Sequence, residues 1–101
     1  MTNAMSELED KVIRVPSRIK CANVWYEPDD KKIQLRVGHT VGEYKKFFAD
    51  LDFPYDSGYG GQVLYGTVWF EDGTWLSRGE YDGSEWWDYN ICPDIPKELE
   101  L

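Results

Sequence analysis

Tryptophans and carboxylates are concentrated in residues 69–87 of this 101-residue sequence. The stretch holds four of the five tryptophans, together with five carboxylates and a single arginine. Two kinds of chemistry use such a mixture. A pair of carboxylates can hydrolyse a glycosidic bond, whereas indole rings beside carboxylates suit the binding of a protein or a carbohydrate. The stretch therefore predicts either a hydrolytic site or a binding site.

Hydrolysis is the weaker interpretation. The candidate pair is Glu80 and Glu85, but glycosidases hold such a pair in a deep cleft with many sugar contacts, and this chain is short for one. The single histidine, His39, has no serine or cysteine motif beside it and is expected in a turn before a helix. We expect no catalytic residues and a protein that is not an enzyme.

Metal and phosphate sites are not expected either. Asp50, Asp52 and Asp56 miss the spacing of a calcium-binding EF-hand loop, and one histidine with two distant cysteines does not make a zinc site. The glycine-rich segment 55–61 lacks the lysine and the following helix of a phosphate-binding loop. The sequence thus implies no metal and no cofactor.

Negative charge belongs to the second half of the chain. Residues 1–50 carry nine Lys/Arg and eight Asp/Glu, which sum to +1, whereas residues 51–101 carry two and eleven, which sum to −9. Direct binding of nucleic acid is disfavoured, because phosphates need a basic surface. A concentrated negative field predicts a basic partner protein, and a solvated acidic face is the simpler alternative.

The chain shows no signal for export or membrane insertion. No apolar run approaches the ~20 residues of a membrane-spanning helix, and the first ten residues contain neither a basic region nor a hydrophobic segment. We expect a cytoplasmic protein that has no membrane partner. In that compartment Cys21 and Cys92 are expected to be buried thiols rather than a disulfide.

Hydrophobic periodicity predicts an α+β fold. Residues 1–10 are expected to be a flexible acidic lead-in that at most frays into a short helix, and residues 11–101 a single domain. The domain is expected to contain an antiparallel sheet of about five strands: an N-terminal hairpin and a C-terminal three-stranded meander. A single helix between them is expected to pack on one face of the sheet.

The hairpin and the helix have clear sequence signals. A strand is expected at 19–26, closed by a Glu-Pro-Asp-Asp turn at 27–30, and alternating apolar residues predict a second strand at 33–37. Thr40 and Glu43 then have the spacing of a capping box, in which each side chain bonds the backbone amide of the other residue. An amphipathic helix over 41–51 is therefore expected.

The meander consists of strands at 63–70, 75–81 and 85–91. Asp-Gly dipeptides at 72–73 and 82–83 separate them, and this dipeptide strongly favours two-residue hairpin turns. We therefore expect two tight hairpins in succession.

Two-residue turns determine which residues face each other. They place Trp69 opposite Leu76 and Arg78 opposite Trp87. A three-residue loop with a bulge at Gly83 is the alternative, and it would move Trp87 by one position.

This register gives the meander two apolar faces. The first carries Leu64, Val68, Phe70, Trp75, Tyr81 and Trp86. The second carries Val63, Tyr65, Trp69, Leu76, Trp87, Tyr89 and Ile91, mixed with Arg78, Glu80 and Glu85. One helix can cover only one face, so we expect it on the first face and a partly exposed, aromatic and acidic second face. A sheet curled into a closed barrel is the alternative.

The exposed second face is the predicted partner-binding site. Indole and phenol rings would act as anchors and carboxylates would steer a basic partner toward them. A homodimer formed through this face is an alternative that its carboxylates would oppose. The predicted partner-binding residues are Trp69, Glu71, Asp72, Arg78, Glu80, Asp82, Glu85, Trp87, Asp88 and Tyr89.

The meander also resembles small acidic proteins encoded by bacteriophages and prophages. The resemblance rests on Trp-Phe-Glu-Asp-Gly-Thr-Trp at 69–75, Gly-Glu-Tyr-Asp-Gly-Ser-Glu-Trp-Trp at 79–87 and Cys-Pro-Asp-Ile-Pro at 92–96. It implies a phage-type inhibitor of host defence, of the anti-CRISPR or anti-restriction kind, that acts as a DNA mimic on a nucleic-acid-binding host protein in the host cytoplasm. An immunity or antitoxin-like protein that neutralises a basic toxin, and a small ligand-binding module, are the alternatives.

Overall fold

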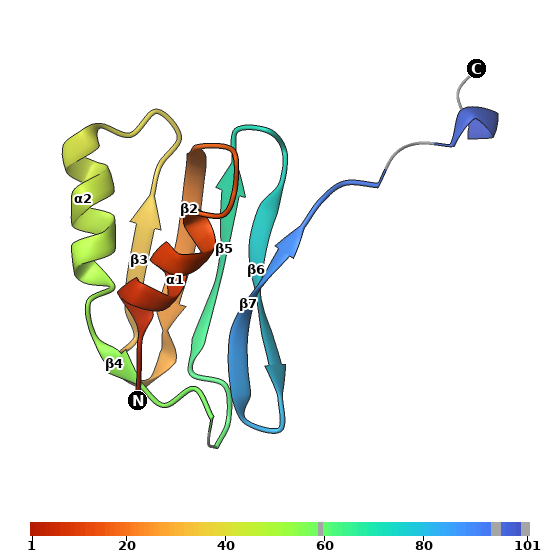
Figure 1. Ribbon diagram of the computed structural model, residues 1–101. Coiled ribbons are helices and arrows are strands. Elements are labelled where there is room, and N and C mark those ends of the chain that lie inside the picture. The colour runs from red at the N-terminus through yellow and green to blue at the C-terminus, as the bar shows by residue number, and fades with distance from the viewer. Residues whose placement is uncertain (59, 94–95, 100–101) are drawn as a thin grey trace.

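Five antiparallel strands form the main sheet of the computed structural model, in the order β3–β2–β5–β6–β7 (Figure 1). The structure describes residues 1–58, 60–93 and 96–99, so Tyr59 of the glycine-rich segment and residues 94–95 of the 92–96 motif lie outside the described residues. The predicted α+β fold, with its N-terminal hairpin and C-terminal meander, is confirmed. The sheet strands are β2 (Ile19–Tyr26), β3 (Lys31–Leu35), β5 (Leu64–Phe70), β6 (Trp75–Tyr81) and β7 (Ser84–Asn90).

Smaller elements complete the fold. A second, two-stranded sheet pairs β1 with β4. One 3-10 turn follows β2, and another lies in the C-terminal segment. Their bounds, with those of the two helices, are β1 (Thr2–Asn3), α1 (Ala4–Val12), η1 (Glu27–Asp29), α2 (Val41–Asp50), β4 (Pro54–Tyr55) and η2 (Lys97–Leu99).

Helix α2 begins at the predicted capping box. The Glu43 amide donates to the Thr40 hydroxyl at 3.1 Å, and the Thr40 amide donates to the Glu43 carboxylate at 3.1 Å. Two otherwise unpaired amides of the first turn are thereby satisfied. The helix then buries Phe47 and Phe48 against the sheet, as its amphipathic pattern predicts.

Helix α1 corrects the expected lead-in over residues 1–10. The Asn3 side chain caps it by accepting a hydrogen bond from the Ser6 amide at 3.0 Å. Ala4 and Leu8 are buried against the sheet, and the pairing of β1 with β4 ties the start of the chain to the domain. The acidic composition of this segment concealed the helix, because its apolar stripe is only two turns long.

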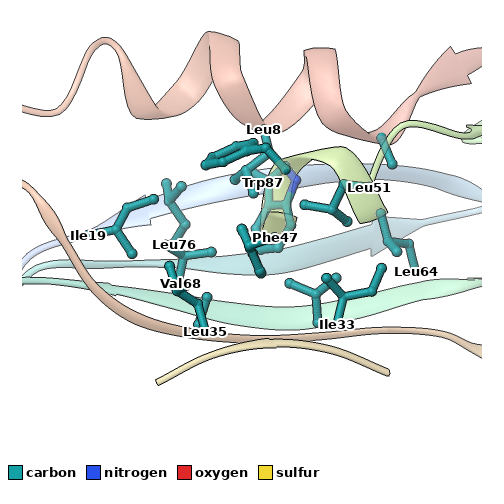
Figure 2. Close-up of a cluster of buried hydrophobic side chains, with 14 of the residues drawn as sticks. Leu8, Ile19, Ile33, Leu35, Phe47, Leu51, Leu64, Val68, Leu76 and Trp87 are labelled. Atoms are coloured by element: carbon teal, nitrogen blue, oxygen red, sulfur yellow. The ribbon is translucent and has the colours of Figure 1, made fainter. Parts of the chain in front are cut away.

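One hydrophobic core joins both helices to the same face of the sheet (Figure 2). Leu8 of α1 and Phe47 of α2 pack on β-strand residues that include Val68 and Leu76. Trp87 lies among them and is the largest fully buried side chain. Both helices therefore cover one face, and in the described part of the chain no helix covers the other (Figure 1).

The first meander turn has three residues instead of the expected two. Trp69 pairs with Trp75, and Gly73 takes the positive φ of 87° that closes a loop of this length. The predicted pairing of Trp69 with Leu76 is therefore wrong. Because side chains alternate along a strand, this shift by one residue turns every β6 and β7 side chain to the face opposite the predicted one, relative to β5.

The second meander turn follows the prediction. Arg78 pairs with Trp87, and both turn residues have positive φ, 52° at Asp82 and 88° at Gly83, as a two-residue type I′ turn requires. The alternative bulge at Gly83 is absent from the described register. Together, the two turns decide which tryptophans are buried.

The cysteines and the helices bear on two further expectations. Cys21 and Cys92 are free thiols, but Cys92 is exposed and Cys21 only half-buried, so the expected burial of both is wrong. Among the described helices, none combines the length and the apolar composition needed to cross a bilayer.

Candidate binding face on the open side of the sheet

Four of the five tryptophans lie on the face of the sheet that carries no helix. Trp25, Trp69 and Trp86 are 39%, 41% and 36% exposed, and Trp75 is half-buried. Trp87 points to the helices and is 1% exposed. Exposed apolar side chains gathered on one surface mark interaction sites in many proteins. We call this surface, with its four tryptophans, the open face.

Two cross-strand aromatic pairs form the apolar part of the open face. Trp25 pairs with Tyr65 across β2 and β5, and their rings stack with centroids 5.3 Å apart and planes 6° from parallel. Trp69 pairs with Trp75 across β5 and β6. Such pairs stabilise neighbouring strands and hold flat rings in fixed positions.

A row of uncharged polar side chains and one carboxylate separates the two aromatic pairs. The register aligns its members across all five strands. At one end of the row, the side-chain amide of Gln34 donates a hydrogen bond to the Asn23 side chain at 3.1 Å. The row consists of Gln34, Asn23, Thr67, Ser77 and Asp88.

Trp86 is held in place beside this row. Its indole N–H donates to Asp88 at 2.8 Å, and its ring lies over Gly79, where an added Cβ would come within 2.4 Å of the indole nitrogen. A glycine is therefore needed at position 79 for the ring to lie flat on β6. The open face is in this respect preorganised for contact, since the ring needs no rearrangement to receive a partner.

The structure separates the predicted partner-binding residues instead of bringing them together. Trp69 and Asp88 lie on the open face. Four acids lie in or near turns at opposite ends of the sheet: Glu71 and Asp72 follow β5, Glu80 lies near the end of β6, and Asp82 lies in the turn after β6. Tyr89 pairs with Leu76 on the helix side of the sheet, but it is 47% exposed.

Three predicted partner-binding residues are interior, and their assignment to a binding surface is wrong. The side chains of Arg78 and Glu85 are 2% and 0% exposed, and Trp87 is buried between them and the helices. The shifted register turns all three toward the helices, and α1 covers them. In their place the open face contains Trp25, Trp75 and Trp86, which the sequence analysis did not select.

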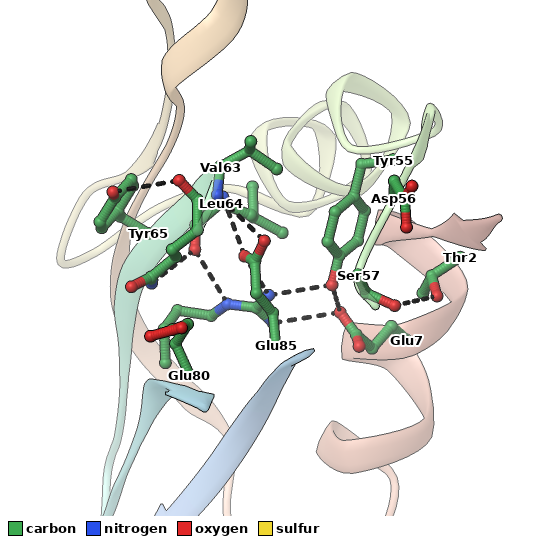
Figure 3. Close-up of polar contacts among 12 residues, drawn as sticks. Thr2, Glu7, Tyr55, Asp56, Ser57, Val63, Leu64, Tyr65, Glu80 and Glu85 are labelled. Carbon is green, nitrogen blue, oxygen red and sulfur yellow. Dashed lines mark hydrogen bonds and ion pairs between the residues drawn. The ribbon is translucent and has the colours of Figure 1, made fainter. Parts of the chain in front are cut away.

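Arg78 and Glu85 belong to a buried ion cluster with Glu7 of α1 (Figure 3). The Arg78 guanidinium donates to Glu7 and Glu85, each at 3.1 Å, and to the Tyr55 hydroxyl at 2.9 Å. The Tyr55 hydroxyl donates in turn to Glu7. The guanidinium also lies 4.9 Å from the Trp87 ring centroid. One cation and two carboxylates thus share a site in which Arg78 and Glu85 are buried and Glu7 lies at the edge, 18% exposed.

The same cluster joins β5 to β6 and β7. The amides of Val63 and Leu64 donate to the Glu85 carboxylate at 3.0 and 3.1 Å, and Arg78 Nε donates to the Leu64 carbonyl at 3.1 Å (Figure 3). Side chains here satisfy backbone groups of β5 beyond the β5–β6 ladder, whose paired residues end at Thr67. Glu80 and Glu85 pair directly across β6 and β7, and repulsion between their carboxylates is avoided because Glu85 turns inward to these donors. The cluster has a structural role.

Tyr55 in this cluster gives a testable pH dependence. Burial first, and then its bond to Glu7, raise the pKa of the Tyr55 hydroxyl far above the usual ~10. The folded state therefore holds this proton more tightly than the unfolded state does, so stability is complete below pH ~10 and falls as the pH rises further. We expect the phenolate absorbance of Tyr55, taken as wild type minus Tyr55→Phe, to appear only as the circular dichroism of the fold disappears. Ionisation at pH ~10 in a folded protein would contradict this.

Acidic residues cluster at one end of the sheet, next to the Trp25–Tyr65 pair. Interaction with Glu27, partial burial, and the charges of Glu27, Glu85 and Glu80 raise the pKa of Tyr65. The turn residues at this end, where β2 and β6 finish, are mostly acidic: Glu27, Asp29, Asp30 and Asp82. The open face itself carries Lys32 and Asp88, and Lys20 lines a hollow beside Trp69. The negative charge around the open face therefore comes from the turns, mainly those at this end, with Glu71 and Asp72 at the opposite end.

Within the described residues, no group of three or more His, Cys, Asp or Glu side chains is arranged to hold a metal ion. The signal that would have identified the open face is Glu71-Asp72-Gly73, which fits a three-residue loop with glycine in the left-handed region as well as a two-residue turn.

Comparison with known proteins found no matching family model, no matching curated protein and no matching solved structure.

Proposed function

We propose that this protein is a non-enzymatic inhibitor or adaptor of the phage type, which binds a basic surface of a host protein through its open face. The observation that carries the proposal is the placement of four of five tryptophans on the face without helices. Tryptophan is the residue most enriched among the energetic anchors of protein interfaces.

Burial of the open face would supply substantial binding energy. A tryptophan buries roughly 150–250 Å² when fully covered, and three of these rings are still more than one-third exposed. Covering each remaining area contributes about 2 kcal/mol at ~25 cal/mol/Å². Since Trp86 and the Trp25–Tyr65 pair are already held in position, little conformational entropy opposes their contact with a partner.

The chemistry of the open face favours a cationic partner. Lysine and arginine side chains bind over the faces of indole rings, and Asp88 lies between the aromatic pairs as a counter-charge. The acidic end beside Trp25 would attract a basic surface and speed its association at low salt. Nucleic-acid-binding proteins have such surfaces, whereas nucleic acid itself would need cations, of which the open face carries Lys32.

Quantitative capture from host lysate, after nuclease treatment, tests the proposal. Wild-type protein is compared with Trp69→Ala/Trp86→Ala, and with Ile13→Ser as the matched control, because Ile13 is an apolar residue that is 79% exposed on the helix side. We expect at least one basic protein that wild type and the Ile13 variant retain and the double variant loses roughly 30-fold or more, as anchors of ~2 kcal/mol imply.

A Gly79→Ala variant refines this test. The added Cβ would displace the Trp86 ring. We therefore expect weaker capture even though this variant keeps both Trp69 and Trp86. Retention of the same proteins by the double variant, or equal losses with Ile13→Ser, would contradict a docking role for the open face.

A further inference from the structure

A polar pocket of about 480 Å³ lies on the helix side of the sheet, away from the open face. Five segments line it: the end of α1, the start of β2, the β3–α2 connection, α2 and the β5–β6 turn. These segments meet at one end of the molecule (Figure 1). A smaller pocket of about 230 Å³ shares Arg18, His39 and Tyr44 with it. Volumes of roughly 300–1,000 Å³ are typical of small-molecule sites.

Hydrogen bonds hold the walls of this pocket together. The Glu71 amide donates to the Arg18 carbonyl at 2.8 Å, and the Asp72 amide donates to the Ser17 hydroxyl at 3.1 Å. The β5–β6 turn is thereby attached to the start of β2. On the other side, His39 Nδ1 donates to the Arg36 carbonyl at 2.9 Å, and its ring stacks on Tyr44.

Opposite charges line the pocket without neutralising each other. Within the described residues neither Arg18 nor Glu71 has an oppositely charged side chain within 4.0 Å. The other nearby arginine, Arg36, is different because Glu43 binds it in bidentate fashion at 2.8 and 2.9 Å. Arg18 and Glu71 are thus a cation and an anion on the wall of one cavity, both available to a ligand.

The remaining lining adds an apolar surface. Ile19 is buried in the core and exposes only its edge to the pocket, and Val12 and the Tyr44 ring lie beside it. An arginine recognises a carboxylate through two parallel hydrogen bonds, and a glutamate recognises an ammonium group. A ligand that satisfies all three features carries both charges and an apolar part.

We infer that this pocket binds a small zwitterion, of the size and chemistry of a free amino acid with an apolar side chain. Arg18 holds the carboxylate, with His39 beside it, Glu71 holds the ammonium group, and the apolar side chain lies against Val12 and Ile19. The site shares no residue with the open face and does not depend on the proposed function.

Three matched probes test the charge requirements: leucine, 4-methylpentanoate, which lacks the amine, and 3-methylbutylamine, which lacks the carboxylate. Binding is followed by amide chemical shifts of the full chain at ligand concentrations up to ~10 mM, suited to millimolar affinity. We expect leucine to shift Gly38, His39 and Glu71 and to bind at least about tenfold more tightly than either analogue. The other apolar amino acids are titrated in the same way.

Variants assign each charge to its residue. Arg18→Gln is expected to weaken leucine and 4-methylpentanoate alike by about tenfold, whereas Glu71→Gln should weaken leucine and leave 4-methylpentanoate unchanged. Arg14→Gln, an exposed arginine outside the pocket lining, is the control and should bind as wild type does. The inference is overturned if no apolar amino acid shifts these resonances, if leucine binds no better than both analogues, or if Arg18→Gln binds like the control.

Discussion

Replacing Arg78 with alanine is expected to lower the free energy of unfolding by about 3–5 kcal/mol. Glu85 and Glu7 would lose the one cation that both contact at 3.1 Å, and Glu85, whose side chain is fully buried, would be left as an unpaired charge away from water. The Leu64 carbonyl would lose its donor as well. A domain of this size is stable by roughly 5–15 kcal/mol, so this one substitution removes a large share of its stability.

Urea denaturation of wild type and Arg78→Ala measures the loss, with a melting temperature expected to fall on the order of 20 °C. Arg36→Ala is the matched control, because Arg36 also binds a glutamate through two bonds but is exposed, and an exposed pair contributes little. Arg78→Lys keeps the charge and loses the forked geometry, so its stability should fall between the two. A loss from Arg78→Ala no larger than that of the control would contradict a structural role for the cluster.

Removal of helix α1 is expected to be equally damaging. Leu8→Ala alone should cost about 2–5 kcal/mol, since the side chain is fully buried among core residues. Deletion of residues 1–12 also removes Glu7 from Arg78 and uncovers Trp87, so the cooperative unfolding transition should be lost. A flexible lead-in would show neither effect.

Glu9→Ala is the control for this prediction, because Glu9 lies on the exposed side of the same helix. Both variants and the deletion are compared by urea denaturation, followed by circular dichroism. A deletion variant that unfolds cooperatively at the wild-type midpoint would show that α1 is not part of the domain.

Elements whose signals are local could be predicted from the sequence. The capping box at Thr40 and the positive φ tolerated by Asp82-Gly83 act over a few residues, so α2 and the β6–β7 hairpin agree with expectation. The strand expected at 19–26 likewise has the observed bounds of β2, because the Glu-Pro-Asp turn that ends it is a local signal. In each case the residues that determine the element are those within it.

The open face could not be predicted because it depends on one residue of loop length. Asp72-Gly73 suits a two-residue turn, but the loop also includes Glu71. That single residue exchanges the faces of Trp75, Trp86 and Trp87 relative to Trp69. Helix α1 was concealed for a different reason: its stability comes from tertiary contacts of Leu8 and Glu7, which no short-range pattern reveals.

The two faces of the sheet use their charged and aromatic residues differently. On the helix side, Arg78 and Glu85 satisfy backbone groups and each other inside the core. On the open face, rings lie in cross-strand pairs at the surface, next to a single carboxylate, Asp88. The concentration of tryptophan and acid in residues 69–87 thus serves stability through one face and exposes rings on the other, the face that we propose binds a partner.

The most direct test of this account is the accessibility of the five indole N–H groups in the free protein. A soluble gadolinium reagent attenuates the NMR signals of surface groups, and single Trp→Phe variants assign each indole resonance. We predict strong attenuation for Trp25, Trp69, Trp75 and Trp86 and protection of Trp87 alone, whose indole nitrogen is buried. Protection of any of the first four to the level of Trp87 would contradict an open face.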